Sequence, residues 1–174
     1  MQIATHLVPQ QVQATESAEL TFDQRERSRV RVTMTNGEEI GIQIKVGSML
    51  SHGDKLALQD GRIVEVIAAD ESLHEVRAAS PTQLARIAYH VGNRHVPLQV
   101  ENDCLLMLPD HVLRAMVDGL GGTVTEVRRG FQPESGAYGH SHVHHSHDDE
   151  GHGGKIHDGL SPRAEAVVPR NEDR

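Results

Sequence analysis

Cysteine is nearly absent from this sequence: Cys104 is the single one among 174 residues, so no intramolecular disulfide can form. A chain of this length can bury a core without disulfides. The N-terminus lacks the basic and then apolar pattern of a secretion signal, and no apolar run reaches the ~18–20 residues that cross a bilayer. We therefore expect a cytoplasmic protein that stays out of the membrane.

Aromatic residues and positive charge are also scarce. Tryptophan is absent, the chain has two phenylalanines and two tyrosines, and the formal net charge is −8. Such a chain repels phosphate backbones and cannot build an aromatic surface on which bases stack. Nucleic acid is therefore excluded as the main partner. Histidine, in contrast, is abundant: of 13 residues, seven lie between His140 and His157.

The first part of the chain shows the alternation typical of strands. Apolar residues alternate over 30–34 and 40–44, on either side of the hairpin-turn sequence Asn36-Gly37. A second hairpin is indicated around Asp60-Gly61. The sequence predicts a small all-β domain over residues 1–71, to which we assign the binding of a peptide or partner.

Beyond residue 71 the apolar period changes to that of helices. Ser80-Pro81-Thr82-Gln83 supplies an N-cap, a first-turn proline and a capping-box glutamine, and Gly92 is the expected C′ residue of this helix. A second helix is predicted from Pro109-Asp110 to Gly121-Gly122. The accompanying strands are expected over 73–78, 96–100, 104–108 and 123–127.

The order of these elements is β-α-β-β-α-β. It predicts that residues 72–134 form a ferredoxin-like domain, a four-stranded antiparallel sheet with both helices on one face. The expected fold class is therefore α+β: a small N-terminal all-β domain, a ferredoxin-like domain, and a tail.

The tail, residues 135–174, offers almost nothing to bury, and we expect it to be disordered. Neutral imidazole binds nickel, copper and zinc, and closely spaced histidines can wrap several ligands around one ion. An expression tag or a solubilising tail is the alternative, and the interruptions by Val143 and Asp148 argue against a tag. A zinc hydrolase is rejected because its ligands need a rigid scaffold. The candidate metal ligands here are His140, His142, His144, His145, His147, His152 and His157.

Three histidines of the preceding domain, His90, His95 and His111, stand next to expected element boundaries. His95 is expected in a loop, where the scaffold fixes a side chain that still reaches the surface. A single histidine cannot hold a metal tightly, but a twofold dimer with this loop near its axis would pair two copies of His95. A surface histidine without a role is the open alternative.

The segment Ala88–Gln99, with the sequence Ala-Tyr-His-Val-Gly-Asn-Arg-His-Val-Pro-Leu-Gln, resembles UreE, the family of urease accessory nickel metallochaperones. Asp110–Leu113 and Gly136–Tyr138 resemble it as well, and Arg25–Arg31 and Asp60–Val66 resemble its N-terminal β-domain. The resemblance covers nearly the whole chain.

This resemblance implies a homodimer joined through the C-terminal domains, in which His95 meets its mate at an interface metal site. It implies a chaperone, not an enzyme, that passes Ni²⁺ to the urease accessory GTPase and finally to the urease apoprotein. Copper and zinc are expected to bind the same histidines.

The sequence departs from the family at Pro109, where some members have the first histidine of a His-x-His pair, so an auxiliary site here retains only His111. His90 is either a packing residue or a ligand. Cys104 is expected to be a small buried hydrophobe.

Two metal-binding hypotheses follow. In delivery, tail histidines capture Ni²⁺ and the His95 pair holds it, with help from His111 or a tail histidine, until a partner removes it. In storage, the tail buffers metal and the folded part only dimerises. A ferredoxin-like RNA-binding module is excluded, because it needs aromatic residues on its sheet and a basic face.

Overall fold

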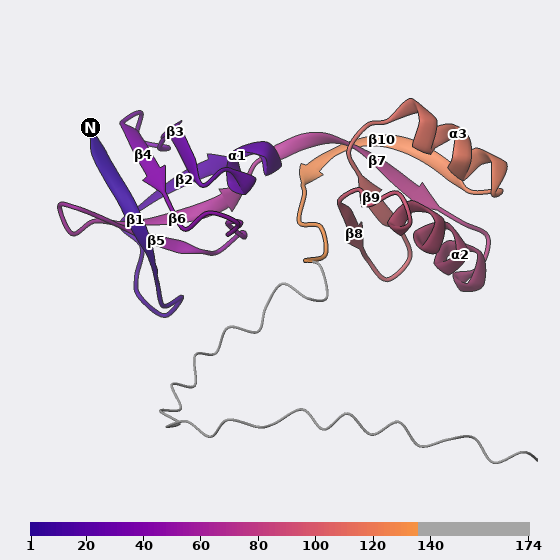
Figure 1. Cartoon of the computed structure of the whole chain (residues 1–174), viewed down its shortest axis with the longest axis horizontal. Helices are drawn as coiled ribbons and strands as arrows, with labels where there is room; N and C mark the ends of the chain where they lie inside the picture. The colour runs from indigo at the N-terminus through magenta and orange to yellow at the C-terminus, as the bar shows by residue number, and fades with distance from the viewer. Residues whose placement is uncertain (136–174) are drawn as a thin grey trace, which may run out of the picture. The chain divides into compact units, whose positions relative to one another are not determined.

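The computed structural model describes residues 1–135. All seven tail histidines lie outside these residues. The prediction that the tail is disordered also concerns residues outside this range. The described part contains a six-stranded sheet followed by a four-stranded sheet that carries two helices (Figure 1). The predicted α+β class is confirmed for this part of the chain.

The six-stranded sheet has the strand order β2-β6-β5-β1-β4-β3. Both predicted hairpins are confirmed, and their turns place Gly37 and Gly61 at φ values of 90° and 89°, which glycine adopts without strain. The first two strands join the sheet through parallel pairings with partners far along the chain, β1 with β4 and β2 with β6. The strands are β1 (Gln2–Val8), β2 (Glu16–Leu20), β3 (Arg29–Thr33), β4 (Glu39–Gln43), β5 (Lys55–Leu58) and β6 (Ile63–Ala68).

The two edge strands of this sheet approach each other, so the sheet is nearly closed. The backbone N–H of Thr35, just after β3, donates to the carbonyl of Ser17 in β2 at 2.9 Å, and their hydroxyls lie 2.9 Å apart. The enclosed core is aliphatic, as the shortage of aromatic residues requires, and includes Ala18, Leu20, Ile40, Ile42, Leu56, Val64 and Val66.

A short helix, α1 (Phe22–Glu26), corrects the prediction that this part of the chain is all β. Thr21 caps it through a full capping box: Thr21 Oγ1 accepts from the N–H of Gln24, and Gln24 Oε1 accepts from the N–H of Thr21. The Thr-x-x-Gln spacing was the available signal, but it lies outside the alternating segments on which the prediction was based.

The second sheet follows almost without interruption, since β7 begins at Asp70, two residues after β6 ends. The elements occur in the predicted β-α-β-β-α-β order, the strand order is β10-β7-β9-β8, and every neighbouring pair is antiparallel. Their bounds are β7 (Asp70–Arg77), α2 (Pro81–Gly92), β8 (Leu98–Val100), β9 (Leu105–Met107), α3 (His111–Gly119) and β10 (Thr123–Gly130).

Both helices of this part cover the same face of the sheet. One core cluster joins Ile87 and Val91 of α2, and Leu113 and Val117 of α3, to buried side chains of β7 and β9. No helix within residues 1–135 has the length and apolar character to cross a membrane.

The end of α2 differs from the prediction. Gly92 is the last helical residue, not the C′ residue, and Asn93 is the C-cap in a right-handed conformation. The chain continues in tight turns, with Arg94 N–H donating to Val91 O and His95 N–H donating to Gly92 O, at 2.9 and 3.0 Å. The left-handed residue that reverses the chain is therefore His95.

The start of α2 was predicted correctly except for its capping glutamine. Ser80 Oγ accepts from the N–H of Gln83, but Gln83 Oε1 accepts from Ala79 N–H and not from that of Ser80. Gln83 Nε2 also donates to the carbonyl of Leu120, at the C-cap of α3. The side chain thus links the two helices by satisfying a carbonyl that α3 leaves unpaired.

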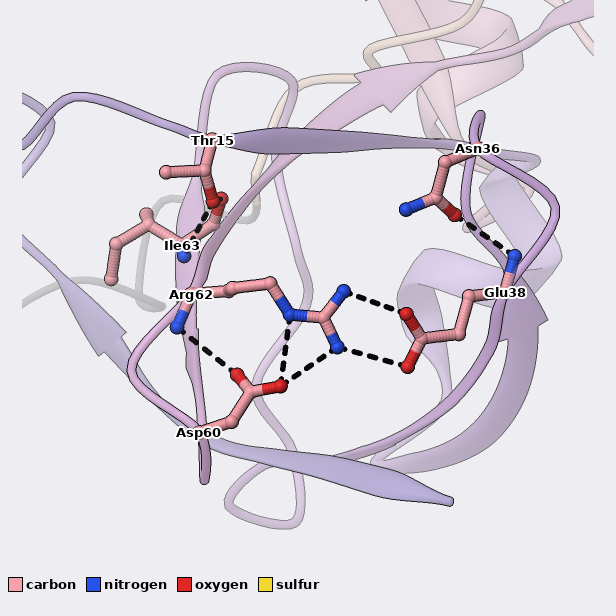
Figure 2. A network of polar contacts seen from close by, with 6 residues as sticks. All are labelled: Thr15, Asn36, Glu38, Asp60, Arg62 and Ile63. Atoms are coloured by element: carbon pink, nitrogen blue, oxygen red, sulfur yellow. Dashed lines mark hydrogen bonds and ion pairs between the residues drawn. The ribbon is translucent and has the colours of Figure 1, made fainter.

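A polar network ties two hairpin turns of the first sheet together (Figure 2). Arg62, in the turn between β5 and β6, donates to both carboxylate oxygens of Glu38 at 2.6 and 2.9 Å, and its Nε donates to Asp60 at 2.8 Å. These bonds from Arg62 lower the pKa of both carboxyl groups. The bidentate geometry makes this pair stronger than an ordinary surface ion pair.

Replacing Arg62 with glutamine should make the melting temperature less dependent on pH in the acidic range. Because the pKa of each carboxyl is lowered in the folded state, their contribution is present above the unfolded pKa values and is lost as pH falls through the folded ones. The Arg62→Gln protein should therefore melt lower than the parent at neutral pH, and the difference in melting temperature should be smaller at about pH 3. Thermal unfolding followed by circular dichroism at both pH values tests this.

Arg31→Gln is the matched control, because the ion pair of Arg31 with Glu39 is long, at 3.9 Å, and exposed. A melting gap for Arg62→Gln that persists unchanged at the acidic pH would show that Arg62 acts through packing and not through these carboxylates.

Candidate metal-binding site

His95 occupies the loop between α2 and β8 and has a φ of 55°, the one positive value among the non-glycine residues of the described chain. Left-handed backbone disfavours most side chains, although histidine is among the residues that tolerate it. The two turn bonds preceding it fix the backbone, and its side chain is exposed. The structure thus holds an accessible imidazole on a rigid, strained turn, which is a common property of functional positions.

His90 and His111 are placed differently. His90 is half-buried in the last turn of α2, and its ring makes an edge contact with that of Tyr89, with the centroids 5.5 Å apart. His111 is exposed as the first residue of α3. Its neighbour Asp110 caps the helix by accepting from the N–H groups of Val112 and Leu113 at 2.7 and 2.9 Å, which lowers the pKa of the Asp110 carboxyl. The predicted start of α3 at Pro109-Asp110 is explained by this cap.

Within residues 1–135, no three His, Cys, Asp or Glu side chains are grouped closely enough to hold a metal ion. His90, His95 and His111 are therefore not brought together as one three-ligand site in this part of a single chain. The remaining candidates, His140 through His157, lie outside the described residues.

Large apolar side chains are exposed beside two of the candidate histidines. Tyr89, before His90, is 67% exposed, and Val112, after His111, is 54% exposed. Each of these apolar side chains is thus available for contact with another protein.

Sequence reasoning missed His74, a histidine of β7 that is only 5% exposed. Its Nδ1 has no hydrogen-bond partner among the described residues, and the residue is paired with Met107 of β9. The flanking buried residues Leu73 and Val76 were the available signal that this position belongs to the interior.

Cys104 is buried, as predicted, with 1% of its surface exposed. Its Sγ lies 3.4 Å from a carboxylate oxygen of Glu101, to which the thiol donates. Burial, together with this hydrogen bond and the charge of Glu101, raises the pKa of the thiol to about 11. The thiolate that binds metals or attacks reagents is therefore disfavoured at neutral pH.

We expect Cys104 to resist alkylation by iodoacetamide in the folded protein at neutral pH and to react fully in denaturant, because both access and thiolate are lacking. Labelling followed by mass spectrometry measures this. Free glutathione under the same conditions calibrates the reagent, and fast modification of the native protein would contradict the burial seen here.

Comparison with known proteins identifies relatives for both parts of the chain. The family model described as UreE urease accessory protein, N-terminal domain, matches residues 4–69, and that of the C-terminal domain matches residues 71–158. The protein is 52% identical over 136 residues to the urease accessory protein UreE of Dechloromonas aromatica, an alignment that covers 75% of this chain and 78% of the relative.

Identity to the urease accessory protein UreE of Ectopseudomonas mendocina is 45% over 158 residues, which is 89% of this chain and 95% of the relative. The corresponding protein of Saccharophagus degradans is 49% identical over 138 residues, 79% of this chain and 77% of the relative. Since the two family models together span most of the sequence and the relatives align over most of their length, this chain belongs to the UreE family of urease accessory proteins.

Proposed function

We propose that this protein is a cytoplasmic nickel metallochaperone, not an enzyme, that delivers Ni²⁺ for assembly of the urease metal centre. Membership in the UreE family supports a role in urease maturation. The observation that carries metal binding itself is His95, an exposed imidazole on a turn whose backbone is held in a left-handed conformation. Imidazole is a suitable ligand for nickel, and also for copper and zinc.

The metal site in this proposal forms between two copies of the chain. One His95 from each copy supplies two nitrogen ligands, and His111 or a tail histidine supplies further ones. The exposed Tyr89 and Val112 are apolar surface that a second copy would cover. Two imidazoles leave coordination positions open on nickel, so an incoming ligand can attack before the first ones leave.

The partners in this proposal are the urease accessory GTPase and the urease apoprotein. We assign their docking to the six-stranded sheet of the N-terminal part, which carries none of the metal-ligand candidates of the site. The tail histidines capture the ion and pass it to the His95 pair.

The test of delivery uses the full chain in which His140, His142, His144, His145, His147, His152 and His157 are replaced by asparagine, here called the tail-Asn variant. We expect this variant to bind one tight Ni²⁺ per dimer and to lose the additional, weaker ions. Isothermal titration at neutral pH measures the stoichiometry, and activation of apo-urease by the nickel-loaded protein in the presence of a competing chelator measures delivery.

Storage is the competing function, and the same experiment separates the two. A storage protein would lose all tight binding in the tail-Asn variant, and chelator would abolish its support of urease activation as it does for free nickel. Either result would show that the folded part of the protein does not deliver nickel.

A further inference from the structure

β10 is an edge strand whose outer side is uncovered within the described part of the chain. It pairs with β7 over its whole length, Thr123–Gly130, in one continuous register. No backbone hydrogen bond joins β10 to any other segment of residues 1–135. Since a strand directs alternate N–H and C=O groups to its two sides, every second residue of β10 turns these groups away from β7. Such an edge can pair with a further strand.

The other sheet edges within residues 1–135 are protected. In the first sheet, the bond from Thr35 N–H to Ser17 O joins the two edge regions. In the second sheet, the opposite edge strand β8 has only three residues, and the N–H of Glu134 donates to its Leu98 carbonyl. Short strands and covering segments block pairing between edges. β10 is eight residues long and contains neither lysine nor proline, which commonly guard an edge.

The charges along β10 match those of a second β10 strand. In an antiparallel pair about a twofold axis, opposite residues share one face of the sheet, so the axis passes beside one residue and not between two. With the axis at Val127, Glu126 of each copy lies opposite Arg128 of the other. An axis at Glu126 or at Arg128 sets like charges against each other, and one at Thr125 sets Glu126 against Val124. The register centred on Val127 is therefore the complementary one.

Both charged side chains are available for this pairing. Glu126 and Arg128 are exposed. Within the chain, Glu126 lies 3.6 Å from Arg114 in an exposed ion pair, which contributes little to stability. Arg128 donates to the carbonyl of Asp70 at 3.1 Å, a bond that leaves its other guanidinium donors free for a carboxylate. On the opposite face of the strand, Val127 is partly buried and would add an apolar contact with its own copy.

We propose that β10 is an interaction surface for a second copy of this chain, in which two β10 strands pair antiparallel about Val127 and join two sheets into one. β10 lies at the opposite edge of the sheet from β8, the strand that follows the His95 loop. The pairing is therefore separate from the His95 contact of the proposed function and does not rest on it. One strand pair is small beside a standard protein interface, so this association is weak, reversible and dependent on concentration.

Reversing the charges tests this register. Glu126→Arg sets arginine against arginine at both ends of the pair, and Arg128→Glu sets glutamate against glutamate. Each variant should associate about tenfold more weakly than the parent, because like charges directly opposite each other destabilise paired strands. Combining both changes in one chain restores opposite charges and should restore the association. Sedimentation velocity of the full chain in chelator, over a series of concentrations, measures this.

A mixture of the two single variants gives a stricter result. In a mixed pair, one strand presents only arginines at these two positions and the other presents only glutamates. The two variants should therefore associate with each other more strongly than either does with itself. Glu19→Arg is the matched control, because it reverses a charge at an exposed position of β2 in the first sheet and should leave association unchanged.

Three results would overturn the proposal: single reversals that associate as the parent does, a combined variant as weak as the single ones, or single variants that do not associate when mixed. Failure of the proposed function is recognised separately, because a His95→Gly chain would then bind nickel as tightly as the parent, whatever the charges on β10. Melting temperatures of all variants establish that each compared protein is folded.

Discussion

His95→Gly should remove the one tight nickel site of the dimer while leaving the protein at least as stable as the parent. The substitution deletes both imidazoles of the site at once if the two copies of His95 meet on a twofold axis. Because His95 has a φ of 55°, glycine relieves the left-handed strain there, which costs an ordinary residue about 1–2 kcal/mol. Titration with nickel and urea unfolding, carried out on the tail-Asn variant, measure the two effects side by side.

His95→Asn is the matched control for the backbone, since asparagine also tolerates left-handed geometry but is a poor nickel ligand. It should lose the metal as completely as the glycine variant. His111→Ala should weaken binding less, because Pro109 leaves it without a neighbouring histidine. If the tight site survives both changes at His95, the assignment is wrong and His111 or His90 becomes the leading candidate.

Phe131→Ala should lower the free energy of unfolding by about 3–5 kcal/mol, the usual cost of truncating a fully buried phenylalanine. The ring is completely buried and packs against Phe22 of the first sheet region and Leu73 and Leu106 of the second sheet. The carbonyl that Arg25 binds belongs to the backbone and is kept, so the experiment isolates the apolar part of the contact. Urea denaturation followed by circular dichroism gives the change.

Val46→Ala serves as the comparison, because Val46 is 83% exposed and its truncation should stay within about 0.5 kcal/mol. Equal stabilities for the two variants would mean that the ring of Phe131 is not buried in solution. Two separate unfolding steps, seen only in Phe131→Ala, would show that this residue couples the two sheets.

Local signals were enough to predict most elements of the second sheet. Ser80-Pro81 and Pro109-Asp110 fix where α2 and α3 begin, and the glycine at 121 has the left-handed φ, 79°, expected after α3. The two hairpins of the first sheet were also predictable from local signals, because Gly37 and Gly61 lie where the turn requires a positive φ.

Contacts between distant residues were beyond prediction. Nothing near Glu16 indicates that it pairs with Val64, and nothing near Phe131 indicates that its ring returns to Phe22. Arg25 begins a segment that resembles the family's N-terminal domain, but the sequence does not indicate that Arg25 is buried. Its burial depends on three carbonyls that only the folded chain brings together. The sequence shows which side chains can donate hydrogen bonds, but only the folded chain determines which carbonyls accept them.

At the candidate site, the sequence predicted that His95 lies in a loop. It did not predict the backbone conformation of this residue. A glycine that follows the apolar stripe of a helix is the residue that usually adopts the left-handed conformation. The sequence therefore favours Gly92 for this role over His95, three positions later. The backbone N–H groups of Arg94 and His95 donate to the carbonyls of Val91 and Gly92, and these turns past the end of the helix move the left-handed residue to His95.

The parallel pairing of β2 with β6 has a consequence for how the chain folds. Glu16 must find Val64 across most of the N-terminal half before that contact gives any stabilisation, whereas β3 and β4 meet across a short turn. Closing such a long loop costs entropy in advance, and non-local sheets fold slowly for this reason. We expect the hairpins to form early and β2 to join last. A chain emerging from the ribosome would therefore hold β2, Glu16–Leu20, without its strand partner until β6 has been synthesised.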